Sequence, residues 1–392
     1  MPDLDEIRST LVAHDQEHLL AFHDTLAAPQ QATLLEQLAA VPWDRLDEWI
    51  ERFVRQPAPP EVPQQITPPP IVPARPRDDA EAARHEAARQ RGRELVAAGK
   101  VAAFVVAGGQ GTRLGYEGPK GCLEATPVAH KPLFQVFAEQ IRAAARREGA
   151  TIPWYIMTSP TNDVATRAFF REHQFFGLDE ADVFFLTQGT LPAISLDGKL
   201  LLAGPGQLAV SPDGHGGSLD ALRASGALDD MRRRGIEQIS YFQVDNPLTH
   251  CIDPLFLGMH AEVEAQMSAK AVAKRDPLEK LGNFCMVDGR VRIIEYSDLP
   301  EELARATTDD GGGDREFCFA GGRDCGRAGS PDRVCRSARD QADDPIGASR
   351  GVPDRGIPCG ARVYRQGDRP ALAAPGAFPA ARVLFGRGTL RR

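Results

Sequence analysis

The sequence lacks any apolar run long enough to cross a lipid bilayer, which takes about 20 residues. Residues 1–8 are acidic and lack the basic-then-apolar layout of a signal peptide, so we expect none there. A surplus of positive charge is missing as well: the formal net charge of -8 at pH 7 argues against broad binding to nucleic acid or to anionic membranes. We therefore expect a cytoplasmic protein that binds neither membrane nor nucleic acid.

Clustered cysteines are also absent. There are seven cysteines, and Cys122, Cys251 and Cys285 are scattered without CxxC spacing. An odd number without such spacing predicts neither a disulfide framework nor a zinc site.

With 392 residues, the chain is too long for one small core, so we expect two or three structural units. Apolar residues at helical spacing between 4 and 26, and again between 34 and 41, predict short helices in an N-terminal segment, 1–56. The stretch 57–77 is rich in proline, which lacks a backbone N–H and fits neither a regular helix nor a central strand. We predict a linker there.

The segment 78–306 has the pattern of an α/β domain. A charged, alanine-rich helix at 78–98, ended by Gly99, precedes a compact apolar strand at 101–107. The alternation continues with helices near 133–147, 162–173 and 254–264 and with strands near 154–158, 239–244, 269–274, 282–287 and 291–295. Strands interleaved with helices imply a mainly parallel, mixed sheet that is covered on both faces.

This order disappears beyond about residue 307. The segment 307–392 has no lysine, many arginines and glycines, four of the seven cysteines and no sustained period of 2 or 3.6. Its cysteines and scattered apolar residues are unusual for a solvated, disordered tail. We favour a reading-frame shift in a GC-rich gene, with a genuine tail as the alternative, and assign no functional residue there.

The strongest motif is a glycine-rich loop directly after the strand at 101–107. Gly108 and Gly109 have no Cβ, so their backbone N–H groups can approach phosphate oxygens closely. Arg113 and Lys120, further along the loop, can neutralise the charge of a triphosphate. A glycine pair alone also fits a simple tight turn.

The whole loop, 106–121, matches neither the P-loop pattern nor a dinucleotide fingerprint that opens directly into a helix. It resembles the signature of sugar-nucleotide pyrophosphorylases, and among these most closely the UTP-dependent UDP-sugar pyrophosphorylases, whose best-known branch makes UDP-N-acetylglucosamine. Further stretches are similar to this family in the same order: 154–159, 169–178, 185–193, 211–217, 244–248 and 294–297. The resemblance covers residues 10 to 306.

The resemblance implies a Rossmann-like nucleotidyltransferase domain preceded by helices. It also implies an activity: transfer of a uridylyl group from UTP to a hexose 1-phosphate, which yields UDP-sugar and pyrophosphate with Mg²⁺ as the cofactor. Arg113 and the glycine loop would then face the leaving pyrophosphate, and Lys120 the phosphates near the reacting centre.

Three residues would hold the metal and the nucleoside. Asp245 follows an apolar strand, where it could simply cap a turn, and the resemblance implies a Mg²⁺ ligand. Gln188 carries both a donor and an acceptor that match the edge of uracil, and the resemblance gives it that role. Gly214 would let the backbone meet the nucleoside, although Asp213-Gly214 is also a good turn.

The sugar side would be lined by His215, Asn246, Gly282 and Glu295. His215 departs from the acetylhexosamine branch of the family, which usually has asparagine there, whereas the glucose-using relatives commonly have histidine. The resemblance therefore leaves both N-acetylglucosamine 1-phosphate and glucose 1-phosphate as substrates. Glu295 would accept hydrogen bonds from sugar hydroxyls, although a glutamate in such a strand is ordinarily just solvated.

A second hypothesis belongs to another class: a nucleotide-sugar binding protein without turnover. Members of the family place a second catalytic lysine downstream of the Glu295-Tyr296-Ser297 motif, and here no lysine follows Lys280. A nicotinamide-dependent oxidoreductase is disfavoured, because it would need a GxGxxG motif that opens a helix and an acidic residue about 20 positions further on.

Overall fold

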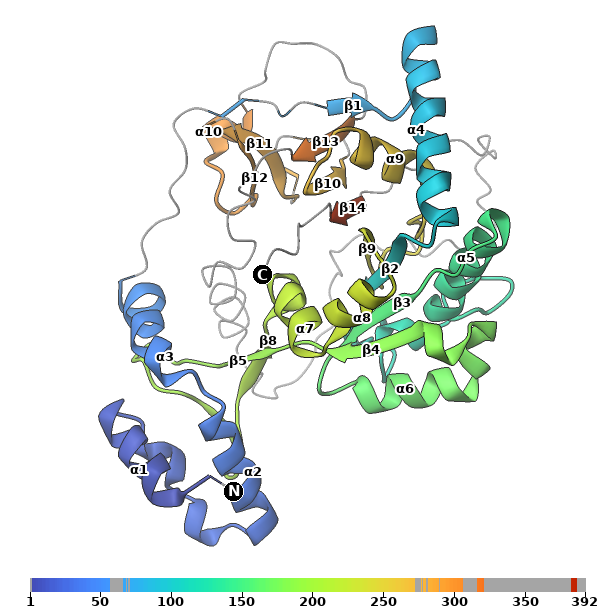
Figure 1. Cartoon of the computed structure of the whole chain (residues 1–392). Coiled ribbons are helices and arrows are strands. Elements are labelled where there is room, and N and C mark those ends of the chain that lie inside the picture. The colour runs from blue at the N-terminus through green and yellow to red at the C-terminus, as the bar shows by residue number, and fades with distance from the viewer. Residues whose placement is uncertain are drawn as a thin grey trace, which may run out of the picture.

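The computed structural model describes residues 2–56, 66, 67, 69, 71–271, 276, 278, 279, 281–288 and 290–305, and the backbone of 316–320 and 382–385. Within these residues the chain forms an α/β domain, a group of N-terminal helices and a small β-hairpin (Figure 1). None of the helices in these ranges is both long enough and apolar enough to cross a membrane.

The centre of the α/β domain is a sheet with eight strands in the described part of the chain. Four neighbouring strands are parallel: β9 (Gln238–Gln243), β2 (Val101–Val106), β3 (Trp154–Thr158) and β4 (Val183–Thr187). Beyond β9 the pairing is antiparallel, through β14 (Arg382–Phe385), β10 (Met267–Lys270), β13 (Glu316–Ala320) and β1 (Ile71–Pro73). The predicted α/β fold is confirmed. Two of the antiparallel strands come from the segment beyond 307, where the sequence predicts none.

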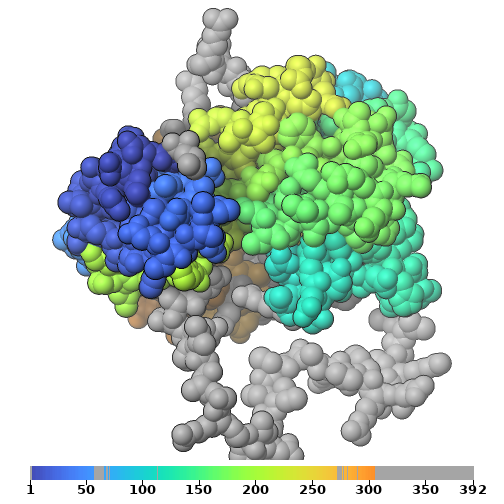
Figure 2. All heavy atoms as spheres, turned by 90° about the horizontal axis from the view of Figure 1, so that it is seen from below, coloured from blue at the N-terminus to red at the C-terminus, as the bar shows by residue number. Residues whose placement is uncertain are grey.

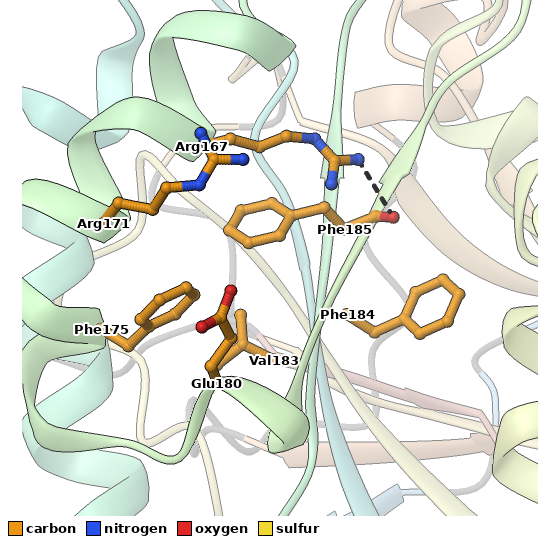
Figure 3. Close-up of a pocket in the computed structure, with 7 residues that line it drawn as sticks. All are labelled: Arg167, Arg171, Phe175, Glu180, Val183, Phe184 and Phe185. Atoms are coloured by element: carbon orange, nitrogen blue, oxygen red, sulfur yellow. Dashed lines mark hydrogen bonds between the residues drawn. The ribbon is translucent and has the colours of Figure 1, made fainter.

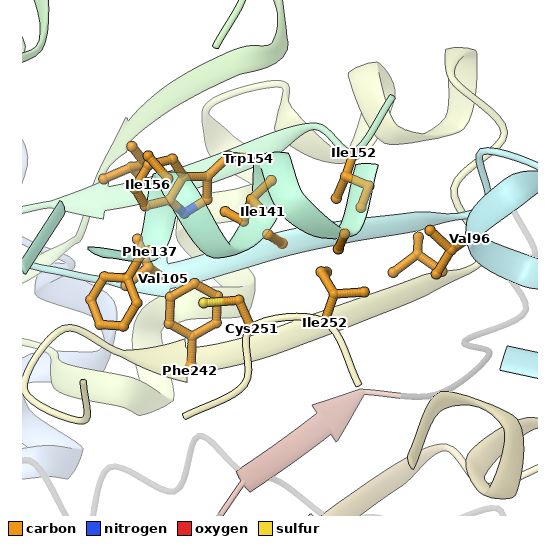
Figure 4. Packing of buried hydrophobic residues seen from close by; sticks show 14 of the residues in the cluster. Val96, Val105, Phe137, Ile141, Ile152, Trp154, Ile156, Phe242, Cys251 and Ile252 are labelled. Atoms are coloured by element: carbon orange, nitrogen blue, oxygen red, sulfur yellow. The ribbon is translucent and has the colours of Figure 1, made fainter. Parts of the chain in front are cut away.

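Helices cover both faces of the sheet, as predicted (Figure 1). One face carries α4 (Asp79–Ala97), α5 (Leu133–Glu148), α6 (Asp163–Glu172) and α9 (Pro254–Glu262), and the other carries α7 (Ser218–Ala224) and α8 (Ala227–Arg233). The side chains of β2 alternate between the two cores. Val105 belongs to the cluster that contains Phe137 and Phe242 (Figure 4), whereas Phe104 belongs to the cluster that contains Leu222.

Helix α4 begins and ends where its sequence supplies caps. The Asp78 carboxylate accepts a hydrogen bond of 2.8 Å from the backbone N–H of Glu81. Just past the C-terminal end, Gly99 adopts a left-handed φ of 68° and donates to the carbonyl oxygen of Val96. Because β2 begins two residues later, this cap fixes the direction in which the chain enters the sheet.

Helices α4 and α9 pack backbone to backbone. A Cβ atom on Gly92 would lie 1.8 Å from the carbonyl oxygen of Pro254, and one on Gly258 would lie 1.6 Å from that of Ala88. Glycine is therefore required at both positions for the observed approach.

The N-terminal helices form a unit with its own core, which contains Leu11, Leu34 and Leu46. Its elements are α1 (Leu4–Ala13), η1 (Glu17–Leu20), η2 (His23–Thr25), α2 (Ala28–Ala39), α3 (Trp43–Trp49) and a π-helical turn, η3 (Ile50–Arg55). The first apolar pattern, 4–26, is broken after α1, because Asp15 adopts a left-handed φ of 55°.

A long excursion leaves the sheet after β4 and returns before α7. Its base is a two-stranded ribbon of β5 (Thr190–Pro192) and β8 (Val210–Pro212), and its tip contains β6 (Leu202–Gly204) and β7 (Gln207–Leu208). Figure 1 shows β5 and β8 running from the sheet to the N-terminal helices, and Figure 2 shows the tip packed beside them. Leu200 and Leu208 belong to the core of the N-terminal unit.

A separate hairpin is made of β11 (Asn283–Val287) and β12 (Arg290–Ile294), as predicted for this part of the chain. It is followed by a short helix, α10 (Glu301–Arg305). Thr67, from the proline-rich stretch, pairs with Met286 of this hairpin. Residues 57–65 of the predicted linker and 272–275 of a predicted strand lie outside the described residues.

Candidate active site

The candidate site lies at the carboxyl ends of the four parallel strands. Gly108 follows β2, Asn162 follows β3, Gln188 follows β4 and Asp245 follows β9. The chain passes from β2 to β3 and β4 on one side, whereas β9 lies on the other side of β2. Strand order therefore reverses between β2 and β9, and in open α/β sheets this is the position at which ligands bind.

The glycine loop folds back on itself. The Gly111 N–H donates to the carbonyl oxygen of Gly118 at 2.9 Å, and the Lys120 N–H donates to that of Gly109 at 3.1 Å. Short 3₁₀ turns follow each half of the loop: η4 (Thr112–Leu114) and η5 (Lys120–Cys122). A Cβ atom on Gly109 would lie 3.5 Å from Lys120 Nζ, so the ammonium group lies over the glycine backbone.

Lys120 and Asp245 meet across the crevice between β2 and β9. The Lys120 Nζ lies 3.0 Å from Asp245 Oδ2, although 125 residues separate them in the sequence. The side chains are 23% and 50% exposed, so both groups remain accessible to a ligand. A cation and a carboxylate are thus available beside a glycine backbone, a set of groups suited to phosphates and their counter-cation.

Asn162 is a component of the site that the sequence pattern did not indicate. Its side chain is buried, and its amide donates to the carbonyl oxygen of Ala107 at 2.9 Å. The amide oxygen accepts from the Ser159 N–H at 2.7 Å. Asn162 thereby ties the start of the glycine loop to the loop after β3. In the sequence, this asparagine only marks the start of the helix predicted near 162–173.

Gln188 is buried against the glycine loop. Its backbone N–H donates to Thr158, which extends the β3–β4 ladder past its end. A Cβ atom on Gly108 would lie 2.7 Å from the Gln188 Oε1 and 2.9 Å from its Nε2. The Gln188 amide therefore occupies the space that a Cβ atom at position 108 would need. Gly108 and Gln188, both predicted site residues, are thus in direct contact.

The Asp213 carboxylate lies between the backbones of Gly189 and Gly217. A Cβ atom on Gly189 would lie 2.4 Å from Asp213 Oδ2, and one on Gly217 would lie 1.9 Å from it. Burial raises the pKa of this carboxyl above its usual range. Its Oδ1 has no hydrogen-bond partner among the described residues. Gly214, the next residue, has a left-handed φ of 66° and begins the turn η8 (Gly214–Gly217) that leads into α7.

His215 is held by a tyrosine from the neighbouring strand. Its Nδ1 forms a hydrogen bond with the hydroxyl of Tyr241 on β9, and the two ring centroids are 6.1 Å apart in an edge-to-face arrangement. Although much of the His215 residue is accessible, burial of the imidazole lowers its pKa, and the negative charge of Asp245 opposes this shift. Burial also raises the pKa of Tyr241. A neutral ring that accepts from Tyr241 at Nδ1 carries its proton at Nε2.

The remaining predicted residues fall into two places. Asn246 follows Asp245, and its N–H donates to Gln243 at 3.1 Å. Gly282 and Glu295 lie together on the hairpin, where a Cβ atom on Gly282 would be 3.6 Å from both carboxylate oxygens. Arg113 lies in η4, and its side chain is outside the described part of the structure.

The residues at the crevice fit a magnesium ion that is held largely by its substrate. Within the described ranges no three His, Cys, Asp or Glu residues cluster as metal ligands. Asp245 offers an accessible carboxylate beside the glycine loop. Mg²⁺ is commonly bound in this way, by one or two carboxylates together with substrate phosphates and water.

A hollow of about 320 Å³ lies away from this crevice, at the start of β4 (Figure 3). Its lining includes Arg167, Arg171, Phe175 and Phe185, and none of the predicted site residues. The Arg167 side chain is bound to Asp163 at 2.7 Å and stacks over Phe185. The guanidinium group of Arg167 is therefore already engaged in contacts within the protein.

A Rossmann-like sheet that carries a glycine loop, a lysine and an aspartate at its switch point defines a nucleotidyltransferase-like fold. The chain belongs to the UTP--glucose-1-phosphate uridylyltransferase family, whose model matches residues 48–311. The match ends close to the point where the regular sequence pattern disappears.

Curated relatives support this assignment. The chain is 39% identical over 319 residues to UDP-N-acetylhexosamine pyrophosphorylase-like protein 1 of Homo sapiens, which covers 78% of this chain and 62% of that protein. It is 41% identical over 224 residues to UDP-N-acetylglucosamine pyrophosphorylase of Saccharomyces cerevisiae, covering 56% of this chain and 47% of the relative. The chain thus spans between about half and two thirds of the length of these relatives.

A solved structure shows a similar fold. The uridine diphosphate N-acetylglucosamine pyrophosphorylase of Trypanosoma brucei, in complex with an inhibitor, superposes with a TM-score of 0.66 at 28% identity. The match covers 82% of this chain and 66% of that one.

Proposed function

We propose that this protein transfers a uridylyl group from UTP to a hexose 1-phosphate, releasing pyrophosphate and forming a UDP-sugar. The observation that carries this proposal is the Lys120–Asp245 pair, 3.0 Å apart beside the glycine backbone, in a chain of the uridylyltransferase family. The chain covers 62% of the human relative and 47% of the yeast relative, so the activity has to be tested on this polypeptide.

The reaction we propose is a direct in-line displacement. An oxygen of the sugar phosphate attacks the α-phosphorus of UTP, a P–O bond forms, and the bond to the β-phosphate breaks so that pyrophosphate leaves with its electron pair. The attacking oxygen is already anionic at neutral pH, so no protein nucleophile is needed. The contribution of the protein is to position the reactants and to stabilise charge.

Lys120 and the glycine loop would bind the phosphates. The Lys120 ammonium lies over Gly109, where it can follow the negative charge that develops as pyrophosphate leaves. The N–H groups of Gly108 and Gly109 are not shielded by a Cβ, and Arg113 in η4 would bind the pyrophosphate end.

Asp245 would hold the Mg²⁺ ion. When bound, this ion would neutralise part of the negative charge of the phosphates. Lys120 is then expected to exchange its contact with Asp245 for one with phosphate, so the observed ion pair keeps both groups in place before the substrate binds.

The nucleoside and the sugar would occupy opposite sides of the crevice. Gln188, fixed against Gly108, would read the edge of uracil, and Gly214 would allow the backbone to approach the ribose. His215 and Asn246 would face the sugar phosphate, with the His215 Nε2 proton available for an oxygen. Gly282 and Glu295 would contact the sugar hydroxyls from the hairpin.

For the sugar, we propose N-acetylglucosamine 1-phosphate. Relatives at 41 and 42% identity, in Saccharomyces cerevisiae and in Schizosaccharomyces pombe, carry the name UDP-N-acetylglucosamine pyrophosphorylase. The second candidate is glucose 1-phosphate, which His215 favours because histidine at this position resembles the glucose-using branch. We also propose a cytoplasmic location, with 78–306 as the catalytic domain and 57–77 as a linker to the N-terminal helices.

The direct test is pyrophosphate release by the full chain with UTP and Mg²⁺, with each sugar phosphate in a separate reaction. Release with N-acetylglucosamine 1-phosphate at a rate at least tenfold above that with glucose 1-phosphate is the expected result. Binding of UTP without release from either sugar would instead support the nucleotide-sugar binding protein.

A further inference from the structure

Gln16 lies far from the crevice in the sequence and in the fold, yet it is one of the few fully buried glutamines in the described structure. Its side chain is 1% exposed. Its Nε2 donates to the carbonyl oxygen of Gly198 at 3.0 Å, and its Oε1 accepts from the Leu200 N–H at 2.8 Å. One amide thus satisfies a donor and an acceptor of the backbone at the tip of the excursion.

Other side chains of the N-terminal unit bind the same tip. The His18 Nε2 lies 2.8 Å from the carbonyl oxygen of Leu200, and the Gln37 Oε1 accepts from the Leu208 N–H at 2.9 Å. Asp15 pairs with Lys199 at 2.8 Å. Leu200 and Leu208 are buried in the core of the helices. The tip of the excursion is therefore built into the N-terminal unit.

The base of the excursion is built from the nucleotide side of the site. The ribbon begins at Thr190, two residues after Gln188, and ends at Pro212, two residues before Gly214. Its strands pair Thr190 with Pro212, and the Asp213 N–H donates to Gly189 at 3.1 Å. The residues proposed to meet uracil and ribose therefore flank the two strands of one ribbon at its base.

The apolar core of the N-terminal unit is separate from the two clusters that flank the sheet. The excursion therefore has its tip in the core of the N-terminal unit and its base beside the sheet of the α/β domain. The paired strands β5 and β8 form a continuous hydrogen-bonded connection between the tip and the base.

We propose that Gln16 is a positioning residue for the uridine site, which it holds in place by fixing the tip of the β5–β8 ribbon. This inference rests on the proposed function, because it assumes that Gln188 and Gly214 bind the nucleoside. Gln16 touches neither substrate nor metal and acts through the ribbon. Loss of this anchor raises the free energy of ordering the site and therefore weakens UTP binding more than it slows the chemical step.

The test compares Gln16→Leu with Gln31→Leu in the full chain. Leucine keeps the approximate size of Gln16 and removes both hydrogen bonds. Gln31 is the control, because the hydrogen bond of its amide, to the carbonyl oxygen of His23 at 2.9 Å, lies within the N-terminal unit. Gln37→Leu, which removes the anchor at Leu208, is a second variant with the same expected direction.

Two readouts are needed. Hydrogen exchange should become faster at 189–192 and 210–217 in Gln16→Leu, in addition to 194–208, and should stay unchanged there in Gln31→Leu. The KM for UTP should rise about fivefold, with kcat at saturating UTP changed less than about twofold.

Exchange that changes only at 194–208, or equal KM values in the Gln16 and Gln31 variants, would overturn the proposal. The exchange readout requires no turnover. A wild-type chain that releases no pyrophosphate would therefore refute the proposed function, while faster exchange at 210–217 in Gln16→Leu would still support transmission along the ribbon.

Discussion

At the scale of single residues, the crevice is built from short contacts between groups that are distant in the sequence. Lys120 reaches Asp245, Gln188 lies on Gly108, and Asn162 holds the backbone of Ala107. Each contact joins loops that follow different parallel strands. The sheet therefore acts as the rigid support, and the side chains make the links across its edge.

Lys120 should be the residue whose loss affects the rate most. In Lys120→Ala, we expect kcat to fall by on the order of 10² or more, because the cation that stabilises charge on the phosphates is removed. Lys100→Ala is the matched control, because Lys100 forms a similar ion pair, with Glu237 at 2.8 Å, at the opposite end of β2. Steady-state rates of pyrophosphate release check both variants. Near-normal turnover in Lys120→Ala would remove this residue from the catalytic machinery.

At the scale of elements, the layer formed by α4, α9 and β10 contains neutral, buried histidines. His260 of α9 is buried, and its Nδ1 lies 2.7 Å from the Ser268 hydroxyl of β10. Burial lowers the pKa of His260 to about 4, from 6.5 in the absence of the fold. Burial also lowers the pKa of His85 in α4. Burial in this layer therefore favours the uncharged form of both imidazoles.

The acid sensitivity of this layer follows with a definite sign. Between about pH 6.5 and 4, the unfolded state binds a proton at His260 and the folded state does not, so stability falls as the pH is lowered. Above pH 6.5 this contribution is constant, and the full loss amounts to about 3 kcal/mol.

Urea unfolding measured across this pH window tests the assignment. His260→Gln should have a shallower pH dependence than the wild type, whereas the exposed His130→Gln should keep the wild-type slope. Equal slopes in all three chains would show that His260 is not the titrating group.

The elements that the sequence predicts well are those whose signal is local. The strand β2 is a short, uninterrupted apolar run, and α4 carries its own caps at Asp78 and Gly99, so both are predicted within about a residue. The excursion could not be predicted in this way, because its order comes from Gln16 and Gln37, more than 150 residues earlier in the chain. Single-sequence periodicity carries no information on such distant contacts.

The candidate site shows the same division. The glycine loop was recognisable, because a strand followed by glycines has a local pattern and a family resemblance. Asn162 and Tyr241 were not recognisable, because their roles depend on which strands become neighbours in the sheet. The strand at 316–320 likewise arises through pairing with β1 and β10, and the strand at 382–385 through pairing with β10 and β9. Neither strand has a sustained periodic signal of its own.

At the scale of the whole molecule, ligand binding should stabilise the fold in a base-specific way. UTP with Mg²⁺ at 100 times its dissociation constant contributes about 2.7 kcal/mol to the free energy of unfolding, which corresponds to an increase in Tm of about 6 °C for a domain of the size of 78–306. ATP with Mg²⁺ should have a much smaller effect, because the Gln188 amide, which lies beside Gly108, is proposed to read uracil.

Thermal unfolding with each nucleotide, in the wild type and in Gln188→Ala, measures this difference. The variant should respond equally weakly to both nucleotides. A wild-type chain that is stabilised as strongly by ATP as by UTP would contradict the role proposed for Gln188.

The close approach of α4 and α9 has a consequence for how substitution data on this protein should be interpreted. In a library of all single substitutions, positions 92 and 258 should tolerate as little change as position 120, because any side chain would collide with a carbonyl oxygen of the facing helix. Yet Gly92 and Gly258 lie at the crossing of α4 and α9 and are not part of the glycine loop. Intolerance to substitution would therefore mark both residues needed for folding and residues needed for the reaction. Substitutions at positions 92 and 258 should lower the folded yield, whereas those at position 120 should lower the turnover per folded molecule.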